Sequence, residues 1–456
     1  MFSKNITLTE EQQIGVDQCV DFIRNGNHEQ YFTLSGKAGT GKSTIIRKVL
    51  GRFRQNNIII GALSHKAKSV ITESVKQDSI KCNSLTIASM LGMTLDQETG
   101  KFVREWYNKK LPPISEAEIV VIDEASMVSE EALKLIFQYK PYGCKILFLG
   151  DRGQLHPIRE ENSDNLSPIF DSPNKALLTT RIRQSADHPV LEFADHYWNN
   201  SQQEFPVEYP VPQECRVNKI QGDNKLLFFE TMNEIKGVLL EKFKEAVDTN
   251  NPNRIKIVTY RNVTRKAINS YFHSALFKKE DGTLSEYNIG ELIIFNDNYN
   301  AEGDNLIDNS SEFQIKRVLR HTMHIKGGKE LTVFGLEIDV HDYFNDRITV
   351  MIKVLAEESK EDYNKYVSSL FTLAKGFPDK SKERKKALKE AWDAKNKYAN
   401  IDYAYSITSH KSQGSTYDTV VVHESDIMLT PVISSCAKSR SIYTALTRAR
   451  YEVYVV

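Results

Sequence analysis

Cysteine is scarce in this 456-residue sequence, with five residues scattered along the chain and no C-x-x-C spacing. An odd, scattered set supports neither a disulfide framework nor a zinc site. We therefore expect a reducing, cytoplasmic compartment, meaning the host cytoplasm for a viral protein. No apolar run approaches the roughly 20 residues of a membrane span, and the opening residues MFSKNITLTEEQQ contain no apolar signal segment. No membrane partner is expected.

An excess of charge of either sign is also missing, because 60 basic residues balance 60 acidic ones. Nucleic acid would have to bind a local basic patch, since no global field attracts a polyanion. Hydrophobic residues make up 40% of the chain and charged residues 26%, which is typical of a folded globular protein. At roughly 100–200 residues per domain, the length predicts two to four domains.

Three glycines, a lysine and two hydroxyl residues lie between apolar runs in TLSGKAGTGKSTII, residues 33–46. Residues 31–35 are predicted to form a strand and residues 44–50 the start of a helix, so the segment fits a phosphate-binding Walker A loop. Lys42 is expected to reach the β- and γ-phosphates of ATP, and the Ser43 hydroxyl to ligate Mg²⁺. The expected nucleotide-binding residues are Gly36, Ala38, Gly39, Thr40, Gly41, Lys42, Ser43 and Thr44. The alternative is a glycine-rich turn that matches by accident.

Two carboxylates end the β-branched run AEIVVIDE, residues 117–124. A buried strand that delivers them beside a phosphate loop indicates a Walker B arrangement. Asp123 would hold the Mg²⁺ shell, while Glu124 would take a proton from the attacking water or orient it. The alternative is a strand that runs into the acidic start of a helix at 129–135.

A third apolar run, residues 145–150, leads into DRGQLHP. Open α/β sheets bind ligands at the carboxyl ends of their strands, so Gln154 is a candidate to sense the γ-phosphate or position water. The alternative is an ordinary loop. Kinases, GTPases, transport ATPases and motors all use phosphate loops, so these motifs alone name no function.

Taken in order, the motifs resemble those of superfamily-one helicases of the RecD-like branch, which includes small phage helicases. Residues 190–255 and 300–400 match poorly. The segments that carry the resemblance are LTEEQ (8–12), GKAGTGKST (36–44), ALSHKAK (62–68), NSLTIASML (83–91), VVIDEASM (120–127), LFLGDRGQLHPI (147–158), LTTRIRQS (178–185), SITSHKSQGSTYD (406–418) and IYTALTRAR (442–450).

The resemblance implies roles for three further residues at the nucleotide. Gln12 matches the glutamine that recognises the adenine edge. Arg183 matches an arginine that contacts the γ-phosphate, and Arg448 an arginine finger from the opposite RecA-like domain. The alternative for Arg448 is a surface cation at a helix C-terminus.

Five other positions carry less information. Lys37 stands where the family often has proline, and Asn262 matches the fourth motif loosely. Tyr443, Thr447 and Arg450 are neighbours of Arg448 in its motif, without an assigned role.

Polar loops that follow strands offer hydroxyls and ammonium groups to DNA phosphates. The alternative is that each is a solvated loop. A turn signal at 98–101 predicts a hairpin within 92–113, whose family counterpart splits the duplex; the alternative is an exposed hairpin with its own apolar cluster. The expected DNA contacts are Ser64, His65, Lys66, Thr86, Phe102, Trp106, His410, Lys411 and Ser415.

The predicted fold class is α/β, with two RecA-like P-loop domains, an inserted β-hairpin and an inserted SH3-like β-barrel with helices. The first RecA-like domain spans 1–185 and carries the hairpin at about 92–113. The second combines 186–285 with 402–456. Residues 286–401 form the insert, SH3-like by resemblance, with charged helices near 358–373 and 380–398 that are either solvated or in contact with DNA.

The expected function is an ATP-dependent translocase and helicase acting on single-stranded and forked duplex DNA in replication or recombination. The 5′-to-3′ direction is implied by the family alone. We expect a monomer, with single-strand-binding or replication proteins as further partners. The alternatives are a P-loop ATPase switch or kinase without translocation, and a remodeller that displaces bound proteins while unwinding poorly. No N-K-x-D guanine motif is present, which argues against a GTPase.

Overall fold

The computed structural model describes most of the chain. The described residues are 8–54, 56–62, 75, 78, 80–95, 102–103, 111–157, 166–181, 188–301, 305–325, 329–341, 347–379, 381–431 and 433–456. Within them, no helix is long and apolar enough to cross a membrane.

A six-stranded parallel sheet organises the first part of the chain, in the order β3-β2-β6-β7-β1-β8. Its strands are β1 (Phe32–Gly36), β2 (Ile58–Ala62), β3 (Asn83–Thr86), β6 (Ile119–Asp123), β7 (Lys145–Gly150) and β8 (Asn174–Leu178). The helices around it are α1 (Glu10–Asn25), α2 (Lys42–Leu50), α4 (Ile87–Met90) and α5 (Glu130–Tyr139). Two apolar clusters cover its two faces, which is why the central strands are continuous apolar runs.

A second six-stranded sheet has the order β19-β11-β20-β21-β10-β9 and is parallel except for the edge pair β9–β10. Its strands are β9 (Lys219–Gln221), β10 (Asn224–Phe228), β11 (Ile255–Thr259), β19 (Ser406–Thr408), β20 (Tyr417–Val422) and β21 (Ala449–Val455). Its helices are α6 (Val190–Asn200), α7 (Met232–Asp248), α8 (Asn262–Phe277), α11 (Ser409–Ser412), α12 (Glu424–Met428) and α13 (Ser435–Leu446). One large core joins these elements, and α6 contributes Val190, Phe193 and Tyr197 to it.

Between α8 and β19 the chain builds a five-stranded antiparallel sheet, β17-β16-β15-β12-β18. Its strands are β12 (Leu292–Phe295), β15 (Glu312–His324), β16 (Glu330–His341), β17 (Arg347–Leu355) and β18 (Ile401–Tyr403), with a small pair β13 (Tyr299–Ala301) and β14 (Asn305–Ile307) beside it. The two charged segments form α9 (Glu357–Lys375) and α10 (Lys382–Lys395), which pack on each other, and α9 also packs on β16. The helices are therefore confirmed, while closure of this sheet into an SH3-like barrel stays a prediction.

Short elements complete the described chain. Strands β4 (Thr94–Leu95) and β5 (Phe102–Val103) pair antiparallel, with Leu95 opposite Phe102. This pair lies where the hairpin was expected, and its role at a duplex stays a prediction. The 3-10 helices are η1 (Pro113–Glu116), η2 (Ala125–Met127), η3 (Pro168–Asp171) and η4 (Gln213–Cys215).

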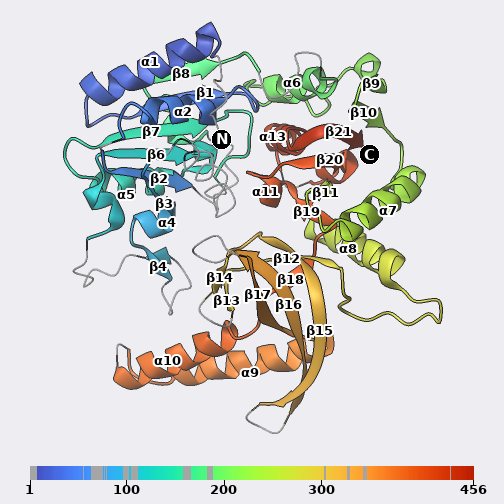
Figure 1. Cartoon of the computed structure of the whole chain (residues 1–456). Coiled ribbons are helices and arrows are strands. Elements are labelled where there is room, and N and C mark those ends of the chain that lie inside the picture. Colours follow the sequence, from blue (N-terminus) through green and yellow to red (C-terminus); the bar gives the residue numbers. More distant parts are fainter. Residues whose placement is uncertain are drawn as a thin grey trace.

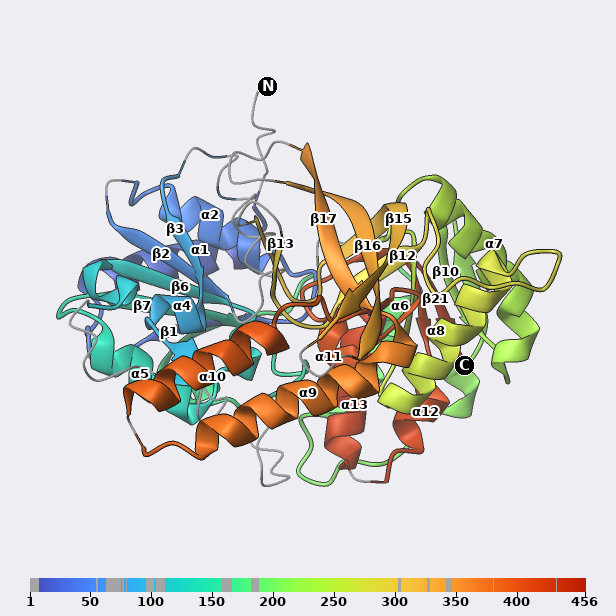
Figure 2. The same cartoon turned by 90° about the horizontal axis from the view of Figure 1, so that it is seen from below.

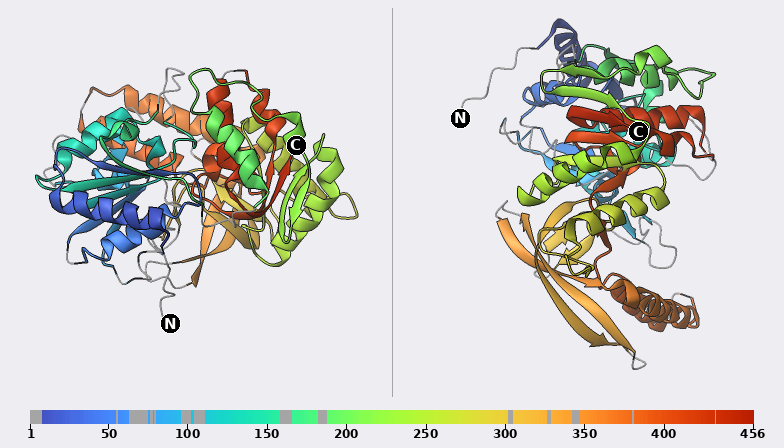
Figure 3. Two further views of the ribbon diagram at one scale, coloured as in Figure 1. Left: turned by 90° about the horizontal axis from the view of Figure 1, so that it is seen from above. Right: turned by 90° about the vertical axis from the view of Figure 1, so that its right-hand side faces the viewer.

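The two six-stranded sheets lie side by side, with the antiparallel sheet below them (Figure 1). Viewed from below, α9 and α10 lie in front of the other elements (Figure 2). The side view shows β15, β16 and β17 curving away from both parallel sheets (Figure 3). The carboxyl ends of β1, β6 and β7 face the second parallel sheet and its helices, which together form the second unit. This arrangement brings α6 and α13 against the phosphate loop.

Candidate nucleotide-binding and catalytic site

The phosphate loop joins β1 to α2. Gly39 and Gly41 have φ values of +83° and +86°, a left-handed conformation that glycine adopts without steric cost. The Lys42 ammonium donates to the carbonyls of Gly36 at 2.7 Å and Lys37 at 3.3 Å. The lysine therefore lies over the loop, beside the start of α2, where backbone N–H groups and the helix dipole favour an anion.

Gln12 lies against this loop. It belongs to a capping box at the start of α1, where its Oε1 accepts from the Thr9 N–H at 3.2 Å. Its Nε2 donates to the Thr40 carbonyl at 3.0 Å, and the side chain is buried. The structure thus brings Gln12 to the phosphate loop, and its recognition of adenine stays a prediction.

The carboxylate pair stands at the end of β6. Glu124 has a φ of +50°, a strained conformation for a residue with a side chain and one that often marks functional sites. Its N–H donates to Asp123 Oδ1 at 2.8 Å. Burial and the neighbouring Glu124 charge raise the pKa of Asp123 to about 7, despite the opposing charge of Lys42. Two neighbouring carboxylates offer the kind of oxygen ligands that suit Mg²⁺, and the roles of Asp123 and Ser43 as its ligands stay predictions.

An Asp123→Asn variant tests how much stability the folded protein loses by keeping a charged carboxylate at this position. In the folded protein the pKa of Asp123 lies above its ordinary value of 3.8. The folded protein therefore binds this proton more tightly than the unfolded chain does, and its stability falls as the pH rises from 3.8 to about 7. Without Mg²⁺ at pH 8, the variant should melt about 2–4 °C higher than wild type, and the difference should shrink toward pH 4. Thermal melts at both pH values measure it. A melting temperature of the variant below that of wild type at pH 8 would contradict a raised pKa of Asp123.

Three predicted catalytic side chains meet across the two sheets. Gln154, in the loop after β7, is buried. In the amide orientation that satisfies both its ends, Nε2 donates to Glu124 Oε2 at 2.8 Å and Oε1 accepts from Arg448 at 3.3 Å. Arg448 lies between α13 and β21 of the second sheet. The structure therefore brings together a carboxylate, an amide and a guanidinium from two separate units.

The Arg448 side chain is 6% exposed and is held by hydrogen bonds to its own lobe. Its Nε donates to the Thr444 carbonyl at 3.1 Å, Nη1 to the Ser415 carbonyl at 3.5 Å and Nη2 to Thr447 Oγ1 at 3.1 Å. Such contacts fix the direction of a flexible side chain and lower the entropy cost of presenting its charge. The contact with Gln154 shows that Arg448 points into the first unit.

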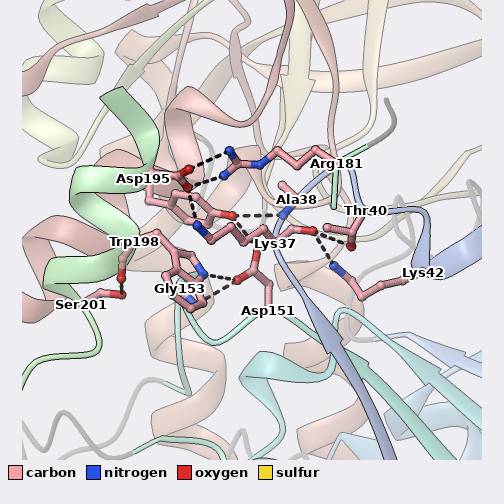
Figure 4. Close-up of polar contacts among 11 residues, drawn as sticks. Lys37, Ala38, Thr40, Lys42, Asp151, Gly153, Arg181, Asp195, Trp198 and Ser201 are labelled. Carbon is pink, nitrogen blue, oxygen red and sulfur yellow. Dashed lines mark hydrogen bonds and ion pairs between the residues drawn. The ribbon is translucent and has the colours of Figure 1, made fainter. Parts of the chain in front are cut away.

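Asp151, which opens the loop after β7, joins several elements (Figure 4). Its Oδ1 accepts from Trp198 Nε1 at 2.9 Å and from the Gly153 N–H at 3.0 Å. Its Oδ2 accepts from the Tyr443 hydroxyl at 2.8 Å. A side chain at Gly153 would collide with the Trp198 ring, since its Cβ would lie 2.0 Å from that ring. Asp151 and Trp198 were not predicted from the sequence, because only their long-range partners reveal them.

The expected DNA-contacting residues are only partly described. Ser64, His65, Lys66 and Trp106 lie outside the described residues, as does Arg183. The backbone of Phe102 lies in β5.

Among the remaining DNA candidates, Thr86 caps α4, where its hydroxyl accepts from the Ser89 N–H at 3.2 Å. His410 packs its ring edge-on to Tyr260, with 5.8 Å between ring centroids, and burial lowers the pKa of this histidine. Lys411 donates to Asn296 Oδ1 at 2.5 Å. Ser415 is 2% exposed and turns its carbonyl to Arg448, so DNA contacts by these residues stay predictions.

Within the described residues, one cluster outside this site has metal-binding side chains. Glu192, His196 and Cys215 place their ligand atoms within 4.8 Å of one another. The Glu192 carboxylate already accepts from Lys219 Nζ at 2.6 Å, and this contact lowers the pKa of Glu192. A metal ion would have to displace that ammonium, so the cluster supports no metal site.

Comparisons with known proteins agree with this arrangement. Residues 8–204 match the AAA domain family, and residues 403–456 match the UvrD-like helicase C-terminal domain. The chain is 21% identical to the ATP-dependent DNA helicase dda of Enterobacteria phage T4, covering 98% of this chain and 99% of the relative. It is 26% identical to an uncharacterized protein of Acanthamoeba polyphaga mimivirus, covering 96% and 97%. The crystal structure of Pif1 helicase from Candida albicans shares its fold, with a TM-score of 0.51 at 15% identity over 99% of this chain and 94% of the other.

Proposed function

Because the chain belongs to the superfamily-one helicases related to Dda and Pif1, we propose how it couples ATP hydrolysis to DNA unwinding. ATP binds the phosphate loop between two RecA-like lobes, closes them and is hydrolysed there. Each closure moves the lobes along single-stranded DNA in the 5′-to-3′ direction. The enzyme is an ATP-dependent DNA helicase, and the direction, the closure and the residue roles are the proposal.

One observation carries the proposal: Arg448 of the second lobe and Glu124 of the first contact the same Gln154 amide. Phosphoryl transfer spreads negative charge over the γ-phosphate oxygens, and a guanidinium supplied across a cleft stabilises that charge. Such a residue reaches the phosphate only when the lobes are close. Hydrolysis therefore depends on lobe separation, and lobe separation depends on the nucleotide.

The residues of the loop would hold ATP, with Ser43 and Asp123 as Mg²⁺ ligands. Mg²⁺ would neutralise charge on the β- and γ-phosphates. Within this chain, Glu124 orients the attacking water or accepts its proton, Gln154 links that carboxylate to Arg448, and Lys42 holds phosphate oxygens. The burial of α6 in the second core supports a boundary near residue 186, with lobes at 1–185 and at 186–285 plus 402–456.

The insert at 286–401 and the hairpin at 92–113 complete the proposed DNA path. The insert would act as an SH3-like domain, and the hairpin would part the duplex. Substrates with a single-stranded tail at only one end measure the direction. Unwinding that requires a 5′ tail supports the proposal, and unwinding that requires a 3′ tail contradicts it.

Hydrolysis should rise when single-stranded DNA is added. Coupling between distant sites typically changes a property by about five- to 150-fold, so we expect stimulation of kcat of about tenfold or more. Steady-state ATP hydrolysis with and without a thymidine oligonucleotide measures it, and a duplex without tails is the matched control. Equal rates with and without the oligonucleotide would reject translocation and favour a P-loop switch.

A further inference from the structure

Lys37 gives the phosphate loop a second cation, and the structure shows what this cation contacts. Its ammonium lies 2.7 Å from Asp195 Oδ1 and 4.6 Å from the centre of the Trp198 ring. Asp195 and Trp198 are three residues apart on α6, so they share one face of that helix. The Lys37 side chain is 20% exposed, and water screens this ion pair only partly.

The carboxylate of Asp195 is shared by two cations. Arg181, which follows β8, donates to Asp195 Oδ1 at 2.7 Å and to Oδ2 at 3.1 Å. Two positively charged groups of the first lobe therefore converge on one acidic side chain of α6, a helix that packs in the core of the second lobe. Breaking this contact would leave two cations near the phosphate loop with no compensating carboxylate.

Ala38, the next residue of the phosphate loop, is held by a different helix of the second lobe, α13. The Ala38 N–H donates to the Tyr443 hydroxyl at 3.0 Å, and that hydroxyl donates to Asp151 Oδ2 at 2.8 Å (Figure 4). Tyr443 is completely buried and belongs to α13. Helices α6 and α13 pack on each other. Two consecutive loop residues are thus bound by two helices that belong to one core.

We propose that Lys37 and Tyr443 are positioning residues that connect the phosphate loop directly to the second lobe. The inference rests on the proposed lobe closure. When the lobes separate, Ala38 loses its acceptor and Lys37 loses Asp195. The half-buried Ala38 N–H would then need another acceptor, because an N–H without one is costly, and water or a phosphate oxygen can provide it. Lobe separation therefore changes how the loop binds polyphosphate, in addition to moving Arg448.

Two substitutions remove one connection each. Lys37→Met keeps the length and apolar stem of the side chain but removes its charge. Tyr443→Phe keeps the buried ring but removes its hydroxyl. Each should lower the factor by which single-stranded DNA raises kcat by about fivefold to tenfold, a typical size for coupling between sites. Each should also reduce the difference between the KM values for ATP measured with and without DNA.

Two further variants separate positioning from mere folding. Lys37→Arg keeps a cation that can bind a carboxylate and stack on an aromatic ring, so it should retain DNA stimulation within about twofold of wild type. Lys134→Met removes a lysine paired with Glu130 on the surface of the same lobe, so it should leave stimulation unchanged. Thermal melts identify any variant that has lost its fold. If Tyr443→Phe does not fold, the comparison of Lys37→Met with Lys37→Arg decides.

The outcomes distinguish the two proposals. A wild-type enzyme that DNA does not stimulate would reject the proposed function and, with it, the coupling role. A wild type stimulated by DNA, with Lys37→Met and Tyr443→Phe stimulated equally, would reject the coupling role alone. Loss of stimulation in Lys37→Met together with its retention in Lys37→Arg would support it.

Discussion

ATP hydrolysis should fall below detection when Lys42 is replaced by alanine. The Lys42 ammonium lies over the phosphate loop, bonded to the carbonyls of Gly36 and Lys37. Incoming phosphate oxygens would compete with these carbonyls for the ammonium and leave it as the main positive charge beside the β- and γ-phosphates. Losses of about 10²–10³-fold accompany removal of a single charge-stabilising donor, and Lys42 also orders the loop before binding.

The matched control is Lys48→Ala, which removes an exposed lysine from the same helix, α2. Hydrolysis by this control should stay close to the wild-type rate. Steady-state phosphate release at saturating ATP and DNA measures both variants. Turnover by Lys42→Ala within tenfold of wild type would show that ATP is not bound at this loop.

The Arg448→Ala variant should retain nucleotide binding but lose at least about 10²-fold in kcat, the scale of other groups that stabilise phosphoryl transfer. Its guanidinium contacts the Gln154 amide, which also contacts Glu124. In the proposed mechanism, it carries the charge that only closure of the lobes brings to the γ-phosphate. Binding of a fluorescent ADP analogue separates the expected loss of kcat from a loss of affinity.

Packing must be separated from chemistry, because Arg448 is buried and holds the Thr444 and Ser415 carbonyls. Arg450→Ala is the control two residues further along, since that side chain is 57% exposed and pairs with Asp418 on the surface. Arg448→Lys keeps the charge but loses the planar fork of donors. Its kcat should lie between those of the wild type and Arg448→Ala. A near-normal rate in Arg448→Ala would exclude this arginine from the transition state.

The nucleotide site was largely predictable because its motifs are local. Glycines at 36, 39 and 41, then Lys42 and Ser43, form a turn whose geometry depends on neighbours in the chain. The Asp123–Glu124 pair and Gln154 follow apolar runs whose strand character is readable from composition. The left-handed conformation of Glu124 was not predictable, because nothing in its residue type demands it.

The contacts that join the lobes were not predictable in the same way. Asp195 and Trp198 lie in a segment that matched no motif, and Lys37 was noticed without an explanation. Their partners are 158 and 47 residues away in the chain, so no local pattern links them.

The amino-acid order alone predicts the chemistry of this protein: a phosphate cradle, a carboxylate pair and arginines that would stabilise transferred phosphate. It predicts these features because each depends on residues that are neighbours in the chain. Only the tertiary structure shows that Arg448 reaches Glu124 through Gln154, and that α6 and α13 hold the phosphate loop through Lys37 and Ala38. Those pairings depend on how two separate cores pack, and that packing brings together groups hundreds of residues apart.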